Sequence, residues 1–254
     1  MRLVRHYARM WQDYDRMADA YLAHAEGSTY NALYDRPAVL ALTGDPEGLA
    51  VLDAGCGPGL YAEELLRRGA VVSAIDASEE QLRLARARLP ESTDIHRAVL
   101  GEPLPFPDEA FDLVICALVI HHVRDRAAAF REFYRVLRPG GRAIVSTQHP
   151  TTDWIRKGGS YFEVREEEDR WVTPGGVFPV RFWREPLSAL CGAATDAGFL
   201  IKRLVEPTPT AEIAERDPVE YAQLEQRPGF LILELVRTRP RARAAGPGDG
   251  APAG

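Results

Sequence analysis

The sequence predicts a doubly wound α/β fold built around a parallel sheet. Apolar runs without polar alternation, such as 49–54 and 111–118, are typical of strands that are buried on both faces. Segments of about 10 to 15 residues with a helical pattern separate these runs. A glycine-rich segment, VLDAGCGPG at 51–59, connects the first of these strands to the next helix. Strands and helices that alternate in this way form a parallel sheet with helices on both faces.

The elements follow one another along most of the chain. The expected strands are 49–54, 71–76, 94–99, 111–118, 142–148, 199–206 and 230–237, and the expected helices are 60–69, 78–90, 124–141 and 185–198. Helix 78–90 has the clearest limits, because Ser78 is a typical N-cap, Gln81 completes a capping box and Pro90 ends the helix.

Three segments fall outside this alternation. The N-terminal part contains two expected helices, at 6–25 and 30–44. Segment 151–184 is rich in turn residues and aromatics, and we expect it to be an inserted β-hairpin that turns at Pro-Gly-Gly, 174–176. Segment 238–254 cannot bury enough apolar surface to fold, so we expect it to be a disordered tail after a main domain at 45–237.

Composition and charge exclude several classes of protein. The formal net charge of −6 argues against a protein that binds nucleic-acid phosphates, which usually has a basic face. No apolar run reaches the roughly 18–20 residues of a membrane span, and residues 1–25 lack the apolar core of a signal peptide. The three cysteines have no metal-ligand spacing. We therefore expect a cytoplasmic protein with no nucleic-acid or membrane partner.

The glycine-rich segment predicts a ligand site with a ribose and no essential phosphate. In open α/β sheets, ligands bind at the carboxyl ends of the strands. Asp76 ends the second strand about 20 residues beyond the loop, where an acidic residue accepts ribose hydroxyls. No Lys-Ser/Thr follows Gly59, so the loop is not a P-loop, and Leu60 stands where the dinucleotide motif needs its third glycine.

Four segments together resemble the class I S-adenosylmethionine-dependent methyltransferases: VLDAGCGPG, VSAIDAS, LPFPDEAFDLVICALVIHHV and RVLRPGG, within about residues 49–148. The resemblance implies a seven-stranded, mostly parallel sheet whose last strand is antiparallel. It implies S-adenosyl-L-methionine as the cofactor. It also implies that residues 1–44 form a helical lid over the cofactor.

The resemblance assigns residues to the polar end of the cofactor. The turn at Gly55 and Gly57, with the helix N-terminus after it, suits the carboxylate. Asp53 lies near the ammonium, and Asp76 accepts both ribose hydroxyls. Either aspartate has an alternative role, Asp53 as a turn cap and Asp76 as a carboxylate at a helix entry.

Adenine recognition departs from the pattern. Related sequences often have an aspartate near the end of the third strand, where this chain has Val99. We therefore expect apolar packing by Ala77, Val99 and Cys116, together with a backbone N–H from Leu100. This departure leaves open weak cofactor binding or a different use of the fold.

Tyr21 is the expected contact between lid and cofactor. Tyr14 and Tyr21 are seven residues apart, so they share one face of a helix. In similar enzymes such a tyrosine closes over the cofactor. The alternative is that both tyrosines belong to a packed core stripe.

Histidines at the carboxyl edge are the candidate bases. His121 and His122 follow the fourth strand, and in similar small-molecule and sugar O-methyltransferases the first histidine faces the acceptor. We therefore expect His121 to be catalytic and His122 to be structural, with His149, after the fifth strand, as the second candidate. Local packing of both adjacent histidines is the alternative. We expect no metal, because neighbouring histidines rarely converge on one ion.

These features predict methyl transfer to a small-molecule acceptor that has an apolar or aromatic face. Aromatic residues of the insertion, Trp154 and Tyr161 first, are the expected acceptor contacts, unless they form the hairpin's own core. Alternatives are a non-methylating reaction such as a cyclisation, and a non-catalytic protein that binds S-adenosylmethionine. A nucleobase amino-methyltransferase is disfavoured by the acidic charge and by Cys-Ala-Leu-Val at 116–119, where an Asn/Asp-Pro-Pro-Tyr/Phe motif would stand.

Overall fold

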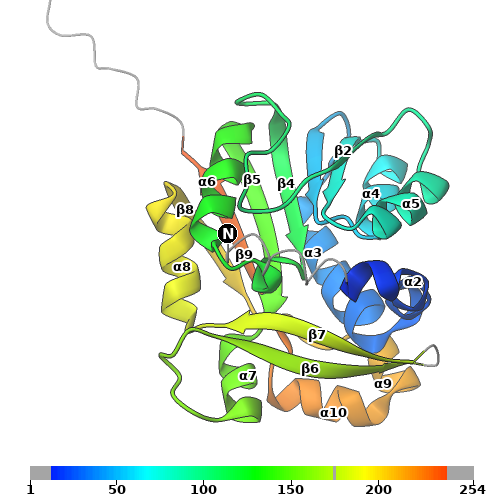
Figure 1. Cartoon of the computed structure of the whole chain (residues 1–254), viewed down its shortest axis with the longest axis vertical. Helices are drawn as coiled ribbons and strands as arrows, with labels where there is room; N and C mark the ends of the chain where they lie inside the picture. Colours follow the sequence, from blue (N-terminus) through cyan, green and yellow to red (C-terminus); the bar gives the residue numbers. More distant parts are fainter. Residues whose placement is uncertain (1–12, 174–175, 239–254) are drawn as a thin grey trace, which may run out of the picture.

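The computed structural model describes residues 13–173 and 176–238, and its centre is a seven-stranded sheet (Figure 1). In spatial order the strands are β3 (Asp94–Arg97), β2 (Val71–Asp76), β1 (Ala50–Ala54), β4 (Phe111–Ala117), β5 (Leu137–Gln148), β9 (Phe230–Arg237) and β8 (Phe199–Val205). Strand β9 is antiparallel to both of its neighbours, and the strands from β3 to β5 are parallel. This confirms the predicted fold class.

Helices cover both faces of the sheet, as the continuous apolar strands require. They are α3 (Arg36–Thr43), α4 (Leu60–Arg67) and α5 (Glu79–Arg88) on one face, and α6 (Arg126–Val136) and α8 (Leu187–Asp196) on the other (Figure 1). Each face has its own buried cluster. Phe130 and Phe133 of α6 are fully buried in one, and Leu65 of α4 and Leu82 of α5 in the other.

The N-terminal region is helical but is divided differently from the prediction. Residues 13–16 form a helical turn, α2 spans Ala18–Gly27, and a π-helical segment, η1 (Thr29–Asp35), leads into α3. The Ser28 side chain caps η1 by accepting a hydrogen bond from the Asn31 backbone N–H at 3.0 Å. The expected helix 6–25 begins before the described residues, so its first part is not described.

The insertion after β5 contains the predicted hairpin and a helix that was not predicted. Helix α7 (Pro150–Lys157) precedes β6 (Arg165–Thr173) and β7 (Gly176–Arg184), which pair with each other and form a separate sheet. In Figure 1 the hairpin crosses below the main sheet. The expected turn at 174–176 lies mostly outside the described residues, as does the expected tail, apart from residue 238.

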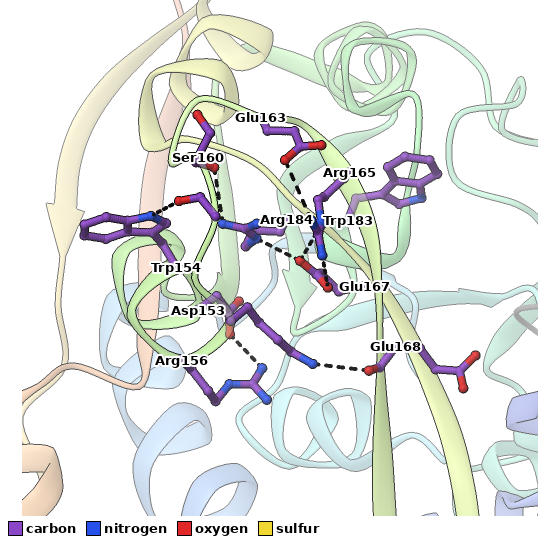
Figure 2. Close-up of polar contacts among 12 residues, drawn as sticks. Asp153, Trp154, Arg156, Ser160, Glu163, Arg165, Glu167, Glu168, Trp183 and Arg184 are labelled. Carbon is purple, nitrogen blue, oxygen red and sulfur yellow. Dashed lines mark hydrogen bonds and ion pairs between the residues drawn. The ribbon is translucent and has the colours of Figure 1, made fainter.

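Ion pairs, one of them fully buried, connect residues at the base of the hairpin (Figure 2). The Arg184 guanidinium donates to Glu167 at 3.1 Å across the two strands, and these residues are only 2% and 7% exposed. Arg165 also pairs with Glu167, at 2.8 Å. On α7, Arg156 pairs with Asp153 at 3.0 Å. Breaking the buried Arg184–Glu167 pair would leave an uncompensated charge, whereas the pairs of the half-exposed Arg165 and Arg156 contribute less to stability.

Two further helices, α9 (Ala211–Arg216) and α10 (Pro218–Gln226), lie between β8 and β9 and were not predicted. They pack against η1 through a small cluster that includes Tyr34, Ile213 and Phe230. None of the helices in the part of the chain that the structure describes has the length and apolarity needed to cross a lipid bilayer.

Candidate active site

One large pocket opens at the carboxyl edge of the parallel strands. Its empty space is about 1080 Å³, counting the part open to solvent. The lining comes from the N-terminal helices, the glycine loop, and the ends of β2, β3 and β4. It includes Tyr14, Tyr21, Asp35, Arg36, Gly55, Cys56, Gly57, Tyr61, Asp76, Ala77, Gln81, Ala98, Val99, Leu100, Ala117, Leu118, Val119, His122 and Val123.

The glycine loop needs glycine because side chains approach it closely. Gly55 has a φ of 84°, and a Cβ there would lie 2.5 Å from a methyl group of Val119. Gly57 has a φ of 53°, and its Cβ would stand 3.7 Å from the Tyr21 ring. Residues with a side chain rarely adopt this backbone conformation. At Gly55 and Gly57 the loop therefore presents only backbone atoms, and the Tyr21 ring lies next to Gly57.

Asp76 joins the loop to the second strand. One carboxylate oxygen accepts a hydrogen bond from the backbone N–H of Gly57 and the other from the N–H of Ser78, both at 2.9 Å. Burial raises the pKa of Asp76, and these backbone donors act in the opposite direction. The carboxylate lines the pocket, and each oxygen keeps a second lone pair. It therefore caps the helix entry and can also accept ligand hydroxyls.

Three expected adenine contacts line the pocket and one does not. Ala77, Val99 and Leu100 are part of the lining. Cys116 is fully buried in the core beside α6, and it is absent from the lining. Successive side chains of a strand point to opposite faces, so the neighbouring Ala117 reaches the pocket instead. This placement does not agree with the expectation that Cys116 packs against the adenine.

Asp53 also lies behind the pocket wall. It is 1% exposed and is not part of the lining. Burial raises its pKa to about 7, although the backbone N–H of Ala62 bonds to the carboxyl group. Its Oδ2 has no hydrogen-bond partner among the described residues. The structure thus places Asp53 against the start of α4 rather than beside the ligand space.

Three polar side chains on the pocket wall were not predicted from the sequence. The Arg36 guanidinium donates to the Ala25 carbonyl at 2.7 Å, and its Nε has no partner in the described chain. Asp35 accepts from the Tyr61 hydroxyl at 2.5 Å, and its Oδ1 is unpaired. Gln81 is 1% exposed, and neither of its amide atoms is bonded within the described chain. Buried polar atoms normally have partners, so these atoms point to a polar ligand.

The two tyrosines expected on one helix face meet at the pocket. The rings of Tyr14 and Tyr21 have centroids 5.7 Å apart in an edge-to-face arrangement, and both line the pocket. Trp171 of β6 lies against Tyr21, with centroids 5.9 Å apart, and against His24 at 4.8 Å. The N-terminal helices therefore pack between the pocket and the hairpin.

The two adjacent histidines occupy the opposite places from those expected. His122 lines the main pocket, whereas His121 is 6% exposed and faces a second, smaller cavity. The cause is the 3-10 turn at Ile120–His122, in which residues three apart share a face. Val119 and His122 thus turn to the pocket together, and His121 packs toward β5, where its Nδ1 lies 3.3 Å from the Thr147 hydroxyl.

His149 is also away from the pocket. Its Nε2 donates to Glu206 at 2.9 Å, the residue is 6% exposed, and it is absent from the lining. None of the described residues between 151 and 184 lines the pocket either. Trp154 and Tyr161 pack against each other instead, with ring centroids 5.8 Å apart. The structure does not place these two aromatic residues beside the ligand space.

Comparison with known proteins identifies the family. A family model described as a methyltransferase domain matches residues 52–145. The chain is 31% identical over 166 residues to a ubiquinone biosynthesis O-methyltransferase of Pseudomonas putida, covering 62% of this chain and 67% of that protein. The chain belongs to the class I S-adenosylmethionine-dependent methyltransferases. It is therefore an S-adenosylmethionine-dependent enzyme, and S-adenosyl-L-methionine is its cofactor.

Two further matches agree with this assignment. A ubiquinone biosynthesis O-methyltransferase of Alkalilimnicola ehrlichii is 43% identical over 107 residues, and the match spans 41% of this chain and only 43% of that protein. The crystal structure of an S-adenosylmethionine-dependent methyltransferase from Mesorhizobium loti superimposes with a TM-score of 0.66 at 27% identity. That superposition covers 84% of this chain and 100% of the other chain.

The pocket residues fit this cofactor. The unpaired Nε of Arg36 suits a carboxylate, and the unpaired Oδ1 of Asp35 suits an ammonium group. The free lone pairs of Asp76 suit ribose hydroxyls. Ala98 and Val99 supply an apolar wall for a purine ring. Groups of the kinds that the two ends of the molecule require thus line one pocket.

Proposed function

We propose that this methyltransferase acts on a hydroxyl group of a small molecule that has an apolar or aromatic face. The observation that carries the proposal is the continuity of the main pocket. Asp76, the glycine loop and His122 all line the same cavity, and Val119 lies directly against the loop at Gly55. A cofactor and an acceptor can therefore meet inside one enclosure.

Bound S-adenosylmethionine supplies a methyl group that a sulfonium has already activated for nucleophilic attack. The protein's task is then to position the acceptor and to exclude water. On this proposal Arg36 and Asp35 hold the charged amino-acid end, and Asp76 holds the ribose. Ala77, Val99 and Leu100 contact the adenine, the last through its backbone N–H.

The lining of the pocket is mostly apolar. Leu118, Val119 and Val123 belong to it, together with the rings of Tyr14 and Tyr21. Ligand sites of this composition bind apolar or aromatic bodies and use the few polar groups for orientation. The names of two relatives, which describe O-methylation in ubiquinone biosynthesis, support an oxygen atom of a small molecule as the acceptor.

We also propose that the N-terminal helices up to residue 44 act as a lid. They carry Tyr14, Tyr21, Asp35 and Arg36, all of which line the pocket. A segment that supplies ligand contacts orders when the ligand binds and shields the reaction from water. The cap hairpin supports this lid through Trp171 rather than by touching the ligand space.

The experiment is methyl transfer from S-adenosylmethionine with a deuterated methyl group, using catechol, phenol and an aliphatic alcohol as acceptors. Mass spectrometry should show one labelled methyl group on catechol or phenol, with S-adenosylhomocysteine formed in equal amount. The Asp76→Asn variant is the control and should form much less of both. Cofactor binding without any labelled product from the three acceptors would contradict the proposal, and a product of unchanged mass would favour a non-methylating reaction.

A further inference from the structure

The cap hairpin holds His122 in one tautomer. The ring Nδ1 lies 2.6 Å from the backbone carbonyl oxygen of Arg181 on β7. A carbonyl oxygen can only accept, so Nδ1 carries the proton and donates it. In a neutral imidazole the other nitrogen, Nε2, then has a free electron pair. Burial lowers the pKa of His122 to about 4, so the ring is neutral near pH 7.

The free electron pair on Nε2 receives a hydrogen bond from Tyr14. The Tyr14 hydroxyl lies 2.9 Å from Nε2, and both side chains line the main pocket. Burial raises the pKa of Tyr14 well above its usual value of 10, so its hydroxyl keeps its proton and acts as the donor. A phenolic hydroxyl from the protein itself therefore occupies the place where a phenolic acceptor would bond to His122.

We propose that Nε2 of His122 takes the acceptor's proton during methyl transfer, and that Tyr14 holds this position until the acceptor hydroxyl replaces it. The inference rests on the proposed O-methylation. Tyr14 belongs to the helical turn at 13–16, which also contacts the hairpin, because Asp13 accepts from the Arg181 guanidinium at 2.7 Å. Arg181 of the hairpin thus holds His122 through its backbone carbonyl, and it holds the turn that carries Tyr14 through its guanidinium.

The step balances in atoms and charge. A bond forms between the acceptor oxygen and the methyl carbon, while the carbon–sulfur bond breaks and its electron pair moves to sulfur. The hydroxyl proton moves to Nε2, so the positive charge passes from the sulfonium to the imidazolium and the pocket keeps its net charge. An oxygen that gains a methyl group becomes strongly acidic, so even a weakly basic imidazole can take its proton. Water then removes that proton.

The other two histidines of this edge lack such an arrangement. His121 is enclosed between the Thr147 hydroxyl and the second cavity, which Arg126 also lines. His149 is paired with Glu206 at 2.9 Å. Among the described histidines, only His122 lines the main pocket.

The tautomer is tested by nitrogen NMR of the full chain labelled with ¹⁵N-histidine and bound to S-adenosylhomocysteine. The His122 signals are those that disappear in the His122→Gln variant. We expect a protonated Nδ1 and an unprotonated Nε2, and Tyr14→Phe should shift the Nε2 signal far more than the Nδ1 signal. A proton on Nε2 in the wild-type protein would overturn the inference.

Methylation of catechol tests the proton transfer itself. His122→Gln should lower kcat by about 10²–10⁴-fold with unchanged cofactor affinity. An equal loss in His121→Gln, or an unaffected His122→Gln, would overturn the inference while the proposed function stands. His96→Gln, on exposed β3, is the control for substitution alone. If the wild-type protein methylates neither catechol nor phenol, the proposed O-methylation fails and the proton-accepting role fails with it.

Discussion

The carboxylate of Asp76 accepts a hydrogen bond from the backbone N–H of Gly57 at 2.9 Å, across the gap between β2 and the glycine loop. The bond fixes the loop against the strand that ends at Asp76. The same carboxylate lines the pocket. A substitution at Asp76 therefore changes both a ligand contact and the conformation of the loop, and the melting temperature reports the second effect separately from ligand affinity.

Asp76→Asn should weaken S-adenosylmethionine binding roughly ten- to hundredfold, because hydrogen bonds to a charged group contribute about 1.5–3 kcal/mol. The asparagine oxygen still accepts from one backbone N–H, but its NH2 group faces the other, so the melting temperature should also fall. Isothermal titration calorimetry measures the affinity. Asp94→Asn, on the neighbouring β3, removes an exposed carboxylate as a control. Equal affinities for wild-type protein and Asp76→Asn would contradict the assignment.

Arg36→Met should weaken binding of S-adenosylhomocysteine about tenfold or more, because a charge-assisted bond to the ligand carboxylate is lost. Binding of 5′-methylthioadenosine, which lacks the amino-acid end, should be unaffected. The affinity of Arg36→Lys for S-adenosylhomocysteine should lie between those of the wild-type protein and Arg36→Met, since lysine keeps the charge but not the planar guanidinium. An equal loss for both ligands would show that Arg36 acts by holding the Ala25 carbonyl and not by contacting ligand.

Trp171→Ala should weaken cofactor binding although Trp171 is not part of the pocket lining. The indole packs edge-to-face on Tyr21 and His24, and each such contact contributes about 0.5–1.5 kcal/mol. Its loss favours an open lid, so the affinity for S-adenosylhomocysteine should fall by about two- to tenfold. Val172→Ala, at the next and exposed position of β6, should have no effect. Unchanged affinity in Trp171→Ala, or an equal loss in both variants, would contradict support of the lid by the hairpin.

The pH dependence of folding should report on His122. Burial lowers its folded pKa to about 4 from 6.5, so the unfolded chain binds the proton more tightly. Its contribution to stability is therefore present above about pH 6.5 and is lost as the pH falls toward 4. Urea unfolding of His122→Gln should show a smaller loss over this window than the wild-type protein. Subtracting the two curves removes the opposing effect of the buried carboxyls Asp35 and Asp53, whose pKa values are raised.

The sheet could be predicted because its signals are local. Continuous apolar strands need cover on both faces, and positive φ angles at Gly55 and Gly57 need glycine. The helices α9 and α10 were missed because their sequences are polar and their one buried face is short. Ile213 is the buried residue of α9, and Leu224 that of α10.

The placement of the site residues needed the structure. Sequence spacing places His121 and His122 at the same strand end, but a single 3-10 turn decides which of them faces the pocket. Arg36 has no local pattern that separates it from the other surface arginines. It reaches the pocket because η1 and α3 fold back over the sheet edge. One sequence signal could have indicated Arg36. It directly follows Asp35, a carboxylate within an otherwise mostly apolar helical segment.

A crystal structure with S-adenosylmethionine and catechol bound would show directly which groups face the reacting atoms. We predict the ribose on Asp76, the ligand carboxylate on Arg36, and a catechol hydroxyl on Nε2 of His122 with the Tyr14 hydroxyl displaced. The methyl carbon should then lie between the sulfur and that hydroxyl. A cofactor bound in this pocket with its methyl group directed away from His122, or a catechol hydroxyl bonded to His121 or His149, would contradict the account.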